Sequence, residues 1–183
     1  TDEQKVDNKP NDDLLSIEFD LAMTICPGKH QEFAATGCEW KRDLKVDLNA
    51  LKDKFHIEVV VSLLSEQDLK ELKVESLCQE IEALGMKSYW YKIADGTVPT
   101  DGKVWKEMVV NVTRELSVNK KKVCVHCMGG LSRTGMFVLS ILKYLNIVNN
   151  ENIEDGVRWI GKSRKGAGGN QAQVQFVKAL KFD

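Results

Sequence analysis

The stretch from Val125 to Gly135 holds the residues of this chain that are best suited to chemistry. It reads VHCMGGLSRTG, with five residues between Cys127 and Arg133. A β-branched, strand-like segment precedes the cysteine, and an apolar helical segment follows the arginine. In a loop that joins a strand to a helix, the backbone N–H groups of residues 128–133 can converge on one point. The spacing therefore predicts a binding site for a tetrahedral oxyanion.

Two side chains add reactivity to this predicted anion site. The positive end of the following helix favours the thiolate form of Cys127, which is the nucleophilic form of a cysteine. The planar guanidinium of Arg133 can bind two oxygens of a phosphoryl group while charge is redistributed in the transition state. The loop therefore offers a nucleophile and a phosphate-binding group together.

Other interpretations of the loop fit its pattern less well. A cysteine at a strand end is usually a small buried apolar residue, but here five constrained positions coincide. A zinc site would need His126 and Cys127 on one side, and neighbours on a strand point to opposite faces. A Walker-type nucleotide loop has a lysine before its Ser or Thr, and neither Ser132 nor Thr134 follows one.

Alternating strands and helices surround the loop. β-branched or alternating apolar runs predict strands at 15–21, 57–64, 88–93 and 123–127. Helical spacing of apolar residues predicts helices at 44–55, 66–84, 103–117, 133–145, 151–163 and 170–181. In the helix at 103–117 the predicted inward face is Val104, Met108, Val112 and Leu116. This order predicts an α/β fold with a mostly parallel central sheet flanked by helices.

Composition sets the limits of the fold and of the partners. With 183 residues, 43% of them hydrophobic, the chain suits one domain with a sizeable core, which we place at 13–183 after a flexible polar arm at 1–12. The net charge of −1 leaves no global basic field for nucleic acid, and we interpret Lys120–Lys122 as a solvated turn. No apolar run reaches the about 18 residues of a membrane span. Five scattered cysteines favour a reducing, cytoplasmic compartment.

The signature CMGGLSR at 127–133 resembles the C-x5-R loop of the cysteine-dependent protein tyrosine and dual-specificity phosphatases. Three further segments carry the resemblance to about residue 181, and they are similar to the cyclin-dependent-kinase-associated phosphatase subfamily: GCEWK (37–41), KIADG (92–96) and QAQVQF (171–176). The resemblance implies a tyrosine-phosphatase-like fold and a cysteinyl-phosphate intermediate, without metal or other cofactor. We expect a monomer whose partners are phosphorylated proteins, a kinase among them.

The resemblance also implies roles in the loop. Cys127 matches the nucleophile, Arg133 the phosphate clamp, and Thr134 the hydroxyl that donates to the cysteine sulfur. His126 matches the residue that orients the loop, with an ordinary packed histidine as the alternative. The residues between the cysteine and the arginine are the expected substrate-binding residues: Met128, Gly129, Gly130, Leu131 and Ser132.

Outside the loop, Asp95 matches the general acid, which must protonate a poor leaving oxygen. A turn aspartate is the alternative for Asp95, and Asp101 is the reserve acid, although it looks more like a helix cap. Gln171 and Gln175 match a glutamine-bearing loop that contributes to the attack of water and to substrate binding. A polar helix cap is the alternative for this pair.

We expect an enzyme that hydrolyses phosphotyrosine and, if its cleft is shallow, phosphoserine and phosphothreonine. Met128, Leu131 and Ser132 include no basic residue, which disfavours phosphoinositides. The alternatives are a phosphatase of a small-molecule, lipid or RNA phosphate, and a phospho-binding module without turnover. Sulfur transfer is weaker, because persulfide chemistry does not need Asp95. Export into another cell is left open.

The catalytic thiolate is also the form that peroxide attacks. A second thiol could trap the oxidised Cys127 as a disulfide. Cys124 lies three residues back on the same strand and should point to the opposite face. The resemblance places Cys38 near the active-site loop, so we favour Cys38 as the trapping thiol, with a buried apolar role as the alternative.

Overall fold

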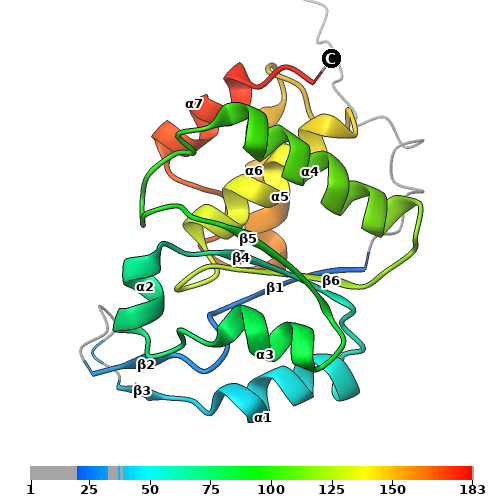
Figure 1. Cartoon of the computed structure of the whole chain (residues 1–183). Helices are drawn as coiled ribbons and strands as arrows, with labels where there is room; N and C mark the ends of the chain where they lie inside the picture. Colours follow the sequence, from blue (N-terminus) through cyan, green and yellow to red (C-terminus); the bar gives the residue numbers. More distant parts are fainter. Residues whose placement is uncertain (1–19, 33–36, 38, 183) are drawn as a thin grey trace, which may run out of the picture.

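A four-stranded parallel sheet forms the centre of the computed structural model, which describes residues 20–32, 37 and 39–182. Its order is β1 (Leu21–Thr24), β6 (Val123–His126), β4 (Val59–Leu63) and β5 (Lys87–Tyr91), and every neighbouring pair is parallel (Figure 1). The parallel sheet is confirmed. The predicted arm at 1–12 and most of the predicted strand at 15–21 lie outside the described residues.

Helices cover both faces of the sheet (Figure 1). One face carries α4 (Gly102–Ser117), α5 (Ser132–Tyr144), α6 (Ile153–Ser163) and α7 (Gln171–Ala179). The other face carries α1 (Leu44–Asn49), the π-helical turn η2 (Ala50–Lys54), α2 (Glu66–Glu71) and α3 (Leu77–Ala83). The expected α/β architecture is therefore confirmed as three layers.

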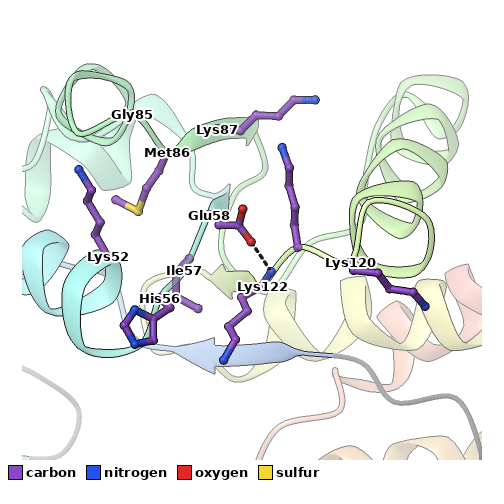
Figure 2. Close-up of a pocket in the computed structure, with 10 residues that line it drawn as sticks. Lys52, His56, Ile57, Glu58, Gly85, Met86, Lys87, Lys120 and Lys122 are labelled. Atoms are coloured by element: carbon purple, nitrogen blue, oxygen red, sulfur yellow. Dashed lines mark hydrogen bonds between the residues drawn. The ribbon is translucent and has the colours of Figure 1, made fainter.

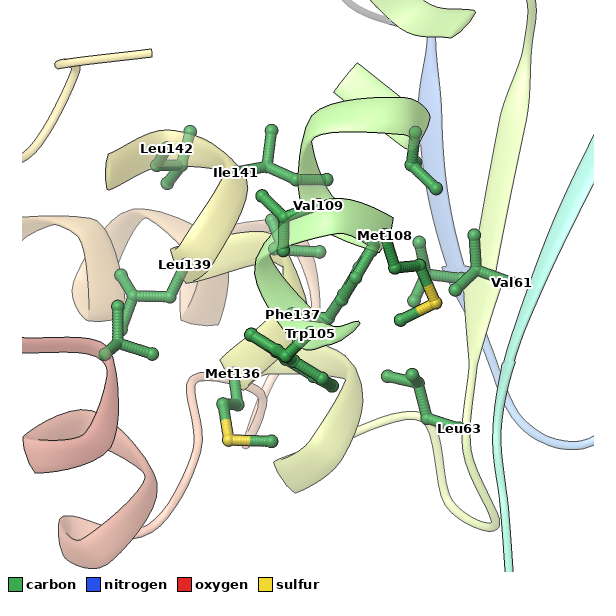
Figure 3. Packing of buried hydrophobic residues seen from close by; sticks show 14 of the residues in the cluster. Val61, Leu63, Trp105, Met108, Val109, Met136, Phe137, Leu139, Ile141 and Leu142 are labelled. Carbon is green, nitrogen blue, oxygen red and sulfur yellow. The ribbon is translucent and has the colours of Figure 1, made fainter. Parts of the chain in front are cut away.

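Side chains of the central strand β4 alternate between two cores. Val59, Val61 and Leu63 belong to the larger core, and Val60 belongs to the smaller one. Trp105 of α4 is fully buried in the larger core, where its ring meets Phe137 edge-on with 5.2 Å between centroids (Figure 3). Because the side chains of β4 point alternately into the two cores, the sheet is buried on both faces, as expected of parallel strands.

The predicted helix at 66–84 was wrong as a single element. It is broken between α2 and α3, and Lys73 in the break has a left-handed φ of 57°. The break lets the Leu72 carbonyl accept a hydrogen bond from the His30 N–H at 3.1 Å, while Leu72 itself stays in the smaller core. Helical spacing persists across the break because both pieces bury apolar residues against the same face.

Three other details differ from the sequence prediction. The short antiparallel pair β2 (His30–Gln31) and β3 (Trp40–Lys41) was not predicted, because two residues show no periodicity. The wider π turn η2 rotates Phe55 out of the apolar stripe, which leaves Phe55 53% exposed. Val104 is 47% exposed, since Trp105 rather than Val104 takes the inward position at the start of α4.

The common strand direction decides where the site lies. The carboxyl ends of parallel strands meet at one edge of a sheet, so the segments that follow them come together. These segments carry Lys29 after β1, Asp68 after β4, Asp95 after β5 and Cys127 after β6. Residues far apart in the sequence therefore share this edge.

Candidate active site

The loop of Cys127 is pressed against the end of β1. Cys127 directly follows β6 and is 2% exposed, and the Met128 carbonyl accepts a hydrogen bond from the Cys26 N–H at 3.3 Å. Gly130 has a φ of 66°, and a Cβ at this position would lie 2.0 Å from the Thr24 carbonyl oxygen. Only glycine fits such a close approach.

Arg164 holds the other side of this loop. Its Nε donates to the Gly130 carbonyl at 2.7 Å, and its Nη2 donates to the Gly129 carbonyl at 2.9 Å. In a trans peptide the carbonyl and the next N–H point in opposite directions. Arg164 therefore turns the N–H groups of Gly130 and Leu131 away from itself. We did not predict this residue from the sequence, which shows it only as one basic residue in a basic segment.

Arg133 is fully buried in the first turn of α5, and its guanidinium has two different edges. On one side Nη1 donates to the Asp68 carboxylate at 2.6 Å and to the Ile93 carbonyl at 2.9 Å. On the other side Nε and Nη2 are buried, with no hydrogen-bond partner among the described residues. The Nε–Nη2 edge is thus available to bind two oxygens of a phosphoryl group.

Asp68 was also not predicted as a site residue. Asp68 is 5% exposed at the start of α2, where it forms a capping box with Ser65. The Ser65 N–H donates to the Asp68 carboxylate at 2.8 Å, and the Asp68 N–H donates to the Ser65 hydroxyl at 3.0 Å. The sequence signal for this cap is S-x-x-D. The same carboxylate oxygen binds Arg133, so the cap fixes the arginine to α2.

Asp95 lies beside the free edge of the arginine. Its Oδ1 is 3.1 Å from Nη2 of Arg133, an ion-pair contact whose angles do not make a hydrogen bond, and its side chain is 65% exposed. Asp101 caps α4 instead, since its carboxylate accepts from the N–H groups of Lys103 and Val104. The geometry brings Asp95 to the Nε–Nη2 edge of Arg133 and confirms the cap interpretation of Asp101.

The start of α7 holds the loop that carries Asp95. Asn170 donates to the Gly96 carbonyl and Gln173 donates to the Thr97 carbonyl, both at 2.9 Å. Asn170 and Gln173 also cap α7 reciprocally. Gln171 and Gln175, the glutamines that we predicted, are exposed on the same helix. The N-x-x-Q spacing could have indicated the anchoring pair.

His126 lies fully buried behind the loop. Its Nε2 is 2.8 Å from the Ser62 hydroxyl, and its Nδ1 is 3.4 Å from the Cys127 carbonyl oxygen. Burial is the main reason that the pKa of His126 is lowered to about 4, and the Arg133 charge adds to it. A neutral, anchored ring can orient the loop, but it is poorly placed to carry protons at neutral pH.

Two buried hydroxyls lie in the first turn of α5. The oxygens of Ser132 and Thr134 have no hydrogen-bond partner among the residues that the structure describes. A buried polar group without a partner is costly unless something else binds it. Thr134 is fully buried at the base of the loop, so its hydroxyl is free to donate.

A cysteine that we did not single out from the sequence, Cys26, also lies beside the loop in the structure. Cys124 lies in the smaller core and Cys127 in the larger one, so the predicted opposite orientation is confirmed. Cys38 lies outside the described residues. The Cys26 N–H bonds the loop at the Met128 carbonyl. Burial raises the pKa of the Cys26 thiol to about 12, and the interaction with Cys127 is a smaller cause. Such a thiol is a slow trap for an oxidised partner.

A cavity of about 440 Å³ lies at the opposite edge of the sheet. Lysines make up half of the residues that line it, and Glu58 lies in its middle (Figure 2). Lys87 and Lys121 of this cavity pair with Glu115, at 2.5 and 3.5 Å. Helices α3 and α4 end here, where cations are favoured. These lysines are therefore explained by helix ends and ion pairs.

No helix among the described residues is long and apolar enough to cross a membrane. In the same part of the chain, no three His, Cys, Asp or Glu side chains gather as a metal site would require.

Comparisons with known proteins show which sequences this chain resembles. A family model described as "Polymorphic toxin system, DSP-PTPase phosphatase" matches residues 35–145. Mouse cyclin-dependent kinase inhibitor 3 is 25% identical over 182 residues, covering 96% of this chain and 81% of the mouse protein. The rat protein of that name is 27% identical, covering 78% of this chain and 66% of its own length.

Solved structures share the fold. Kinase-associated phosphatase with its catalytic cysteine changed to serine superimposes with a TM-score of 0.75 at 22% identity, covering 86% of this chain and 83% of that chain. Tk-PTP in its active form gives a TM-score of 0.61 at 25% identity, covering 74% and 84% of the two chains.

Proposed function

Because the chain belongs to the DSP-PTPase phosphatases of polymorphic toxin systems, it is a cysteine-dependent protein phosphatase, and we propose that it works through a cysteinyl-phosphate on Cys127. The proposed substrates are phosphotyrosine, with phosphoserine and phosphothreonine as further substrates. The observation that carries the mechanism is the free Nε–Nη2 edge of Arg133, which lies beside Asp95 and at the start of the helix that follows the cysteine loop.

In the first proposed step the Cys127 sulfur attacks phosphorus. An S–P bond forms while the bond to the leaving oxygen breaks, and Asp95 gives its proton to that oxygen. Arg133 and the N–H groups of the loop bind the other phosphoryl oxygens as their charge changes. The residues that supply these groups are Met128, Gly129, Gly130, Leu131 and Ser132.

In the second proposed step water attacks phosphorus and the S–P bond breaks. The Asp95 carboxylate takes the proton from the water, and inorganic phosphate leaves. The unpartnered hydroxyl of Thr134 supports a role as donor to the departing sulfur. Gln171, exposed in the first turn of α7, is the proposed orienting residue for the water.

The comparisons support the proposed partners and place of action. The relatives are called a cyclin-dependent kinase inhibitor and a kinase-associated phosphatase, which supports a phosphorylated kinase as one substrate. The family model describes a toxin system, which supports action in the cytoplasm of a recipient cell as well as of the cell that makes it. We propose a monomer, since one chain supplies every group named above.

Turnover on a substrate panel tests this function. We expect release of phosphate from phosphotyrosyl, phosphothreonyl and phosphoseryl peptides, unchanged by a chelator because the loop and Arg133 supply the positive charge. The Cys127→Ser variant should keep its fold and release no phosphate, since a serine hydroxyl stays protonated. Turnover only with an added divalent cation, or only on a phosphoinositide, would contradict the proposal.

A further inference from the structure

Lys29 lies beside the catalytic loop, at the end of a tightly held turn. The turn follows β1, and Cys26 at its start bonds the loop at Met128. Gly28 has a φ of 69° and donates its N–H to the Asp47 carboxylate at 2.8 Å. The next residue, His30, bonds the Leu72 carbonyl behind α2. Lys29 is therefore placed between the catalytic loop and the helix that carries Asp68.

Lys29 is a buried cation. It is 6% exposed, a burial that lysines almost never show unless they are paired. Among the described residues no carboxylate lies within ion-pair distance of it. Its ammonium lies 5.3 Å from the centre of the Trp40 ring, a contact that holds a cation without neutralising it.

Lys29 lies within electrostatic range of two cysteines. Burial lowers the pKa of Lys29, and its interactions with Cys26 and Cys127 act in the opposite direction as smaller causes. The nearby carboxylates are already bound: Asp68 to Arg133 at 2.6 Å, and Asp47 to Arg42 at 2.5 Å. Among the described residues the ammonium thus has no carboxylate partner, and it belongs to the turn that Cys26 joins to the loop of Cys127.

We propose that Lys29 forms a second anion-binding subsite beside the catalytic loop, for a phosphoprotein that carries a carboxylate or a second phosphate next to the hydrolysed residue. This inference rests on the proposed function and narrows its substrates. One lysine suits one additional anionic group, whereas the loop residues Met128, Leu131 and Ser132 supply no further cation. In this proposal Lys29, in the turn after β1, supplies the basic residue that the loop at 128–132 lacks.

Peptide pairs test the subsite. Each pair has one phosphotyrosyl peptide with Glu on either side of the phosphotyrosine and one with Gln at the same positions. We expect the wild-type protein to favour the Glu peptide by about tenfold in kcat/KM, as for a charge-assisted contact. Lys29→Met, which keeps the apolar stem, should reduce the ratio to about one, and Lys29→Arg should retain a preference. The exposed Lys45, changed to Met, is the matched control and should leave the ratio unchanged.

A binding measurement separates this inference from the proposed function. Binding to the Cys127→Ser variant can be measured without turnover. Calorimetric titration of this variant with both peptides therefore reports the preference for the Glu peptide even if the protein hydrolyses no substrate. Thermal unfolding of Lys29→Met and Lys29→Arg shows whether each variant folds. If one does not fold, the titration of Cys127→Ser, which retains Lys29, decides whether the Glu peptide binds more tightly than the Gln peptide. Equal binding of the two peptides would overturn the subsite. A Lys29-dependent preference for a phosphoinositide headgroup over both peptides would overturn the phosphoprotein assignment.

Discussion

The proposed function gives Arg133 two tasks, one for each edge of its guanidinium. Asp68 and the Ile93 carbonyl bind Nη1, and this leaves Nε and Nη2 for phosphate. Without the Asp68 carboxylate, the buried guanidinium would keep only the Ile93 carbonyl and the exposed Asp95 as partners. At the residue scale, we therefore expect the orientation of the proposed phosphate clamp to depend on a carboxylate from another element.

Asp68→Asn tests this dependence. We expect kcat/KM for an aryl phosphate to fall about 10- to 100-fold, because the charge-assisted bond to Nη1 weakens and the free edge loses its orientation. The inhibition constant for inorganic phosphate should rise in parallel. Asp155→Asn, which removes an exposed pair with Arg158, is the control. Unchanged phosphate inhibition in Asp68→Asn would show that Asp68 only caps α2.

Asp95→Asn tests the general acid. Phosphopeptides should lose about 100-fold in kcat, whereas aryl phosphates with good leaving groups should lose much less, because they need no proton. Rates on both substrate types with the same protein give the comparison. The α4 cap Asp101→Asn should lower stability and leave the ratio of the two rates unchanged. A larger ratio change in Asp101→Asn would move the acid role to Asp101.

At the scale of elements, α7 and the loop after β5 act as one unit. Gln173→Ala removes the bond to the Thr97 carbonyl and half of the α7 cap. We expect phosphopeptide turnover to fall several-fold more than aryl phosphate turnover, since the loop that positions Asp95 loosens. Steady-state kinetics on both substrates measure this. Gln175→Ala, exposed on the same helix, should match the wild type, and an equal loss in both variants would count against the anchoring role.

The sequence could predict elements that bury their apolar residues regularly, and it failed where tertiary contacts changed the backbone. The strands at 57–64 and 123–127 were found because β-branched runs buried on both faces leave a clear pattern. The break after α2 was missed because the helices on both sides of it bury their apolar residues in the same smaller core. The π turn η2 was missed because the helical period of the apolar residues changes over a single turn only.

Within the site, what could be predicted was local. Cys127, Arg133 and the glycines form one continuous string, so their chemistry shows in the sequence. Asp68 contacts Arg133 and Arg164 contacts the loop from two distant segments, and only the fold brings them together. Each looks like an ordinary surface charge in the sequence.

At the scale of the whole molecule, buried His126 couples folding to pH. Its pKa is about 4 in the folded protein against an ordinary 6.5, so the unfolded chain binds more protons between these values. The free energy of unfolding should therefore fall by about 3 kcal/mol as pH drops from 6.5 to 4. Denaturant unfolding at a series of pH values measures this.

His126→Gln is the variant that isolates this effect. It should be less stable at pH 7 and should show a flatter pH dependence between 6.5 and 4. Glu115, whose pKa is lowered to about 2 chiefly by its bond to Lys87, loses its contribution only below about pH 4.5, so the two effects occupy different windows. An identical slope above pH 4.5 in His126→Gln and wild type would contradict the assignment.

The central claim is a phosphoryl group carried on the sulfur of Cys127. Acid quenching during turnover of a phosphotyrosyl peptide, followed by proteolysis and mass spectrometry, tests it most directly. We expect one phosphoryl group on the peptide that contains Cys127, present in Cys124→Ser and absent in Cys127→Ser. A phosphoryl group on any other residue, or undiminished turnover in Cys127→Ser, would contradict the account.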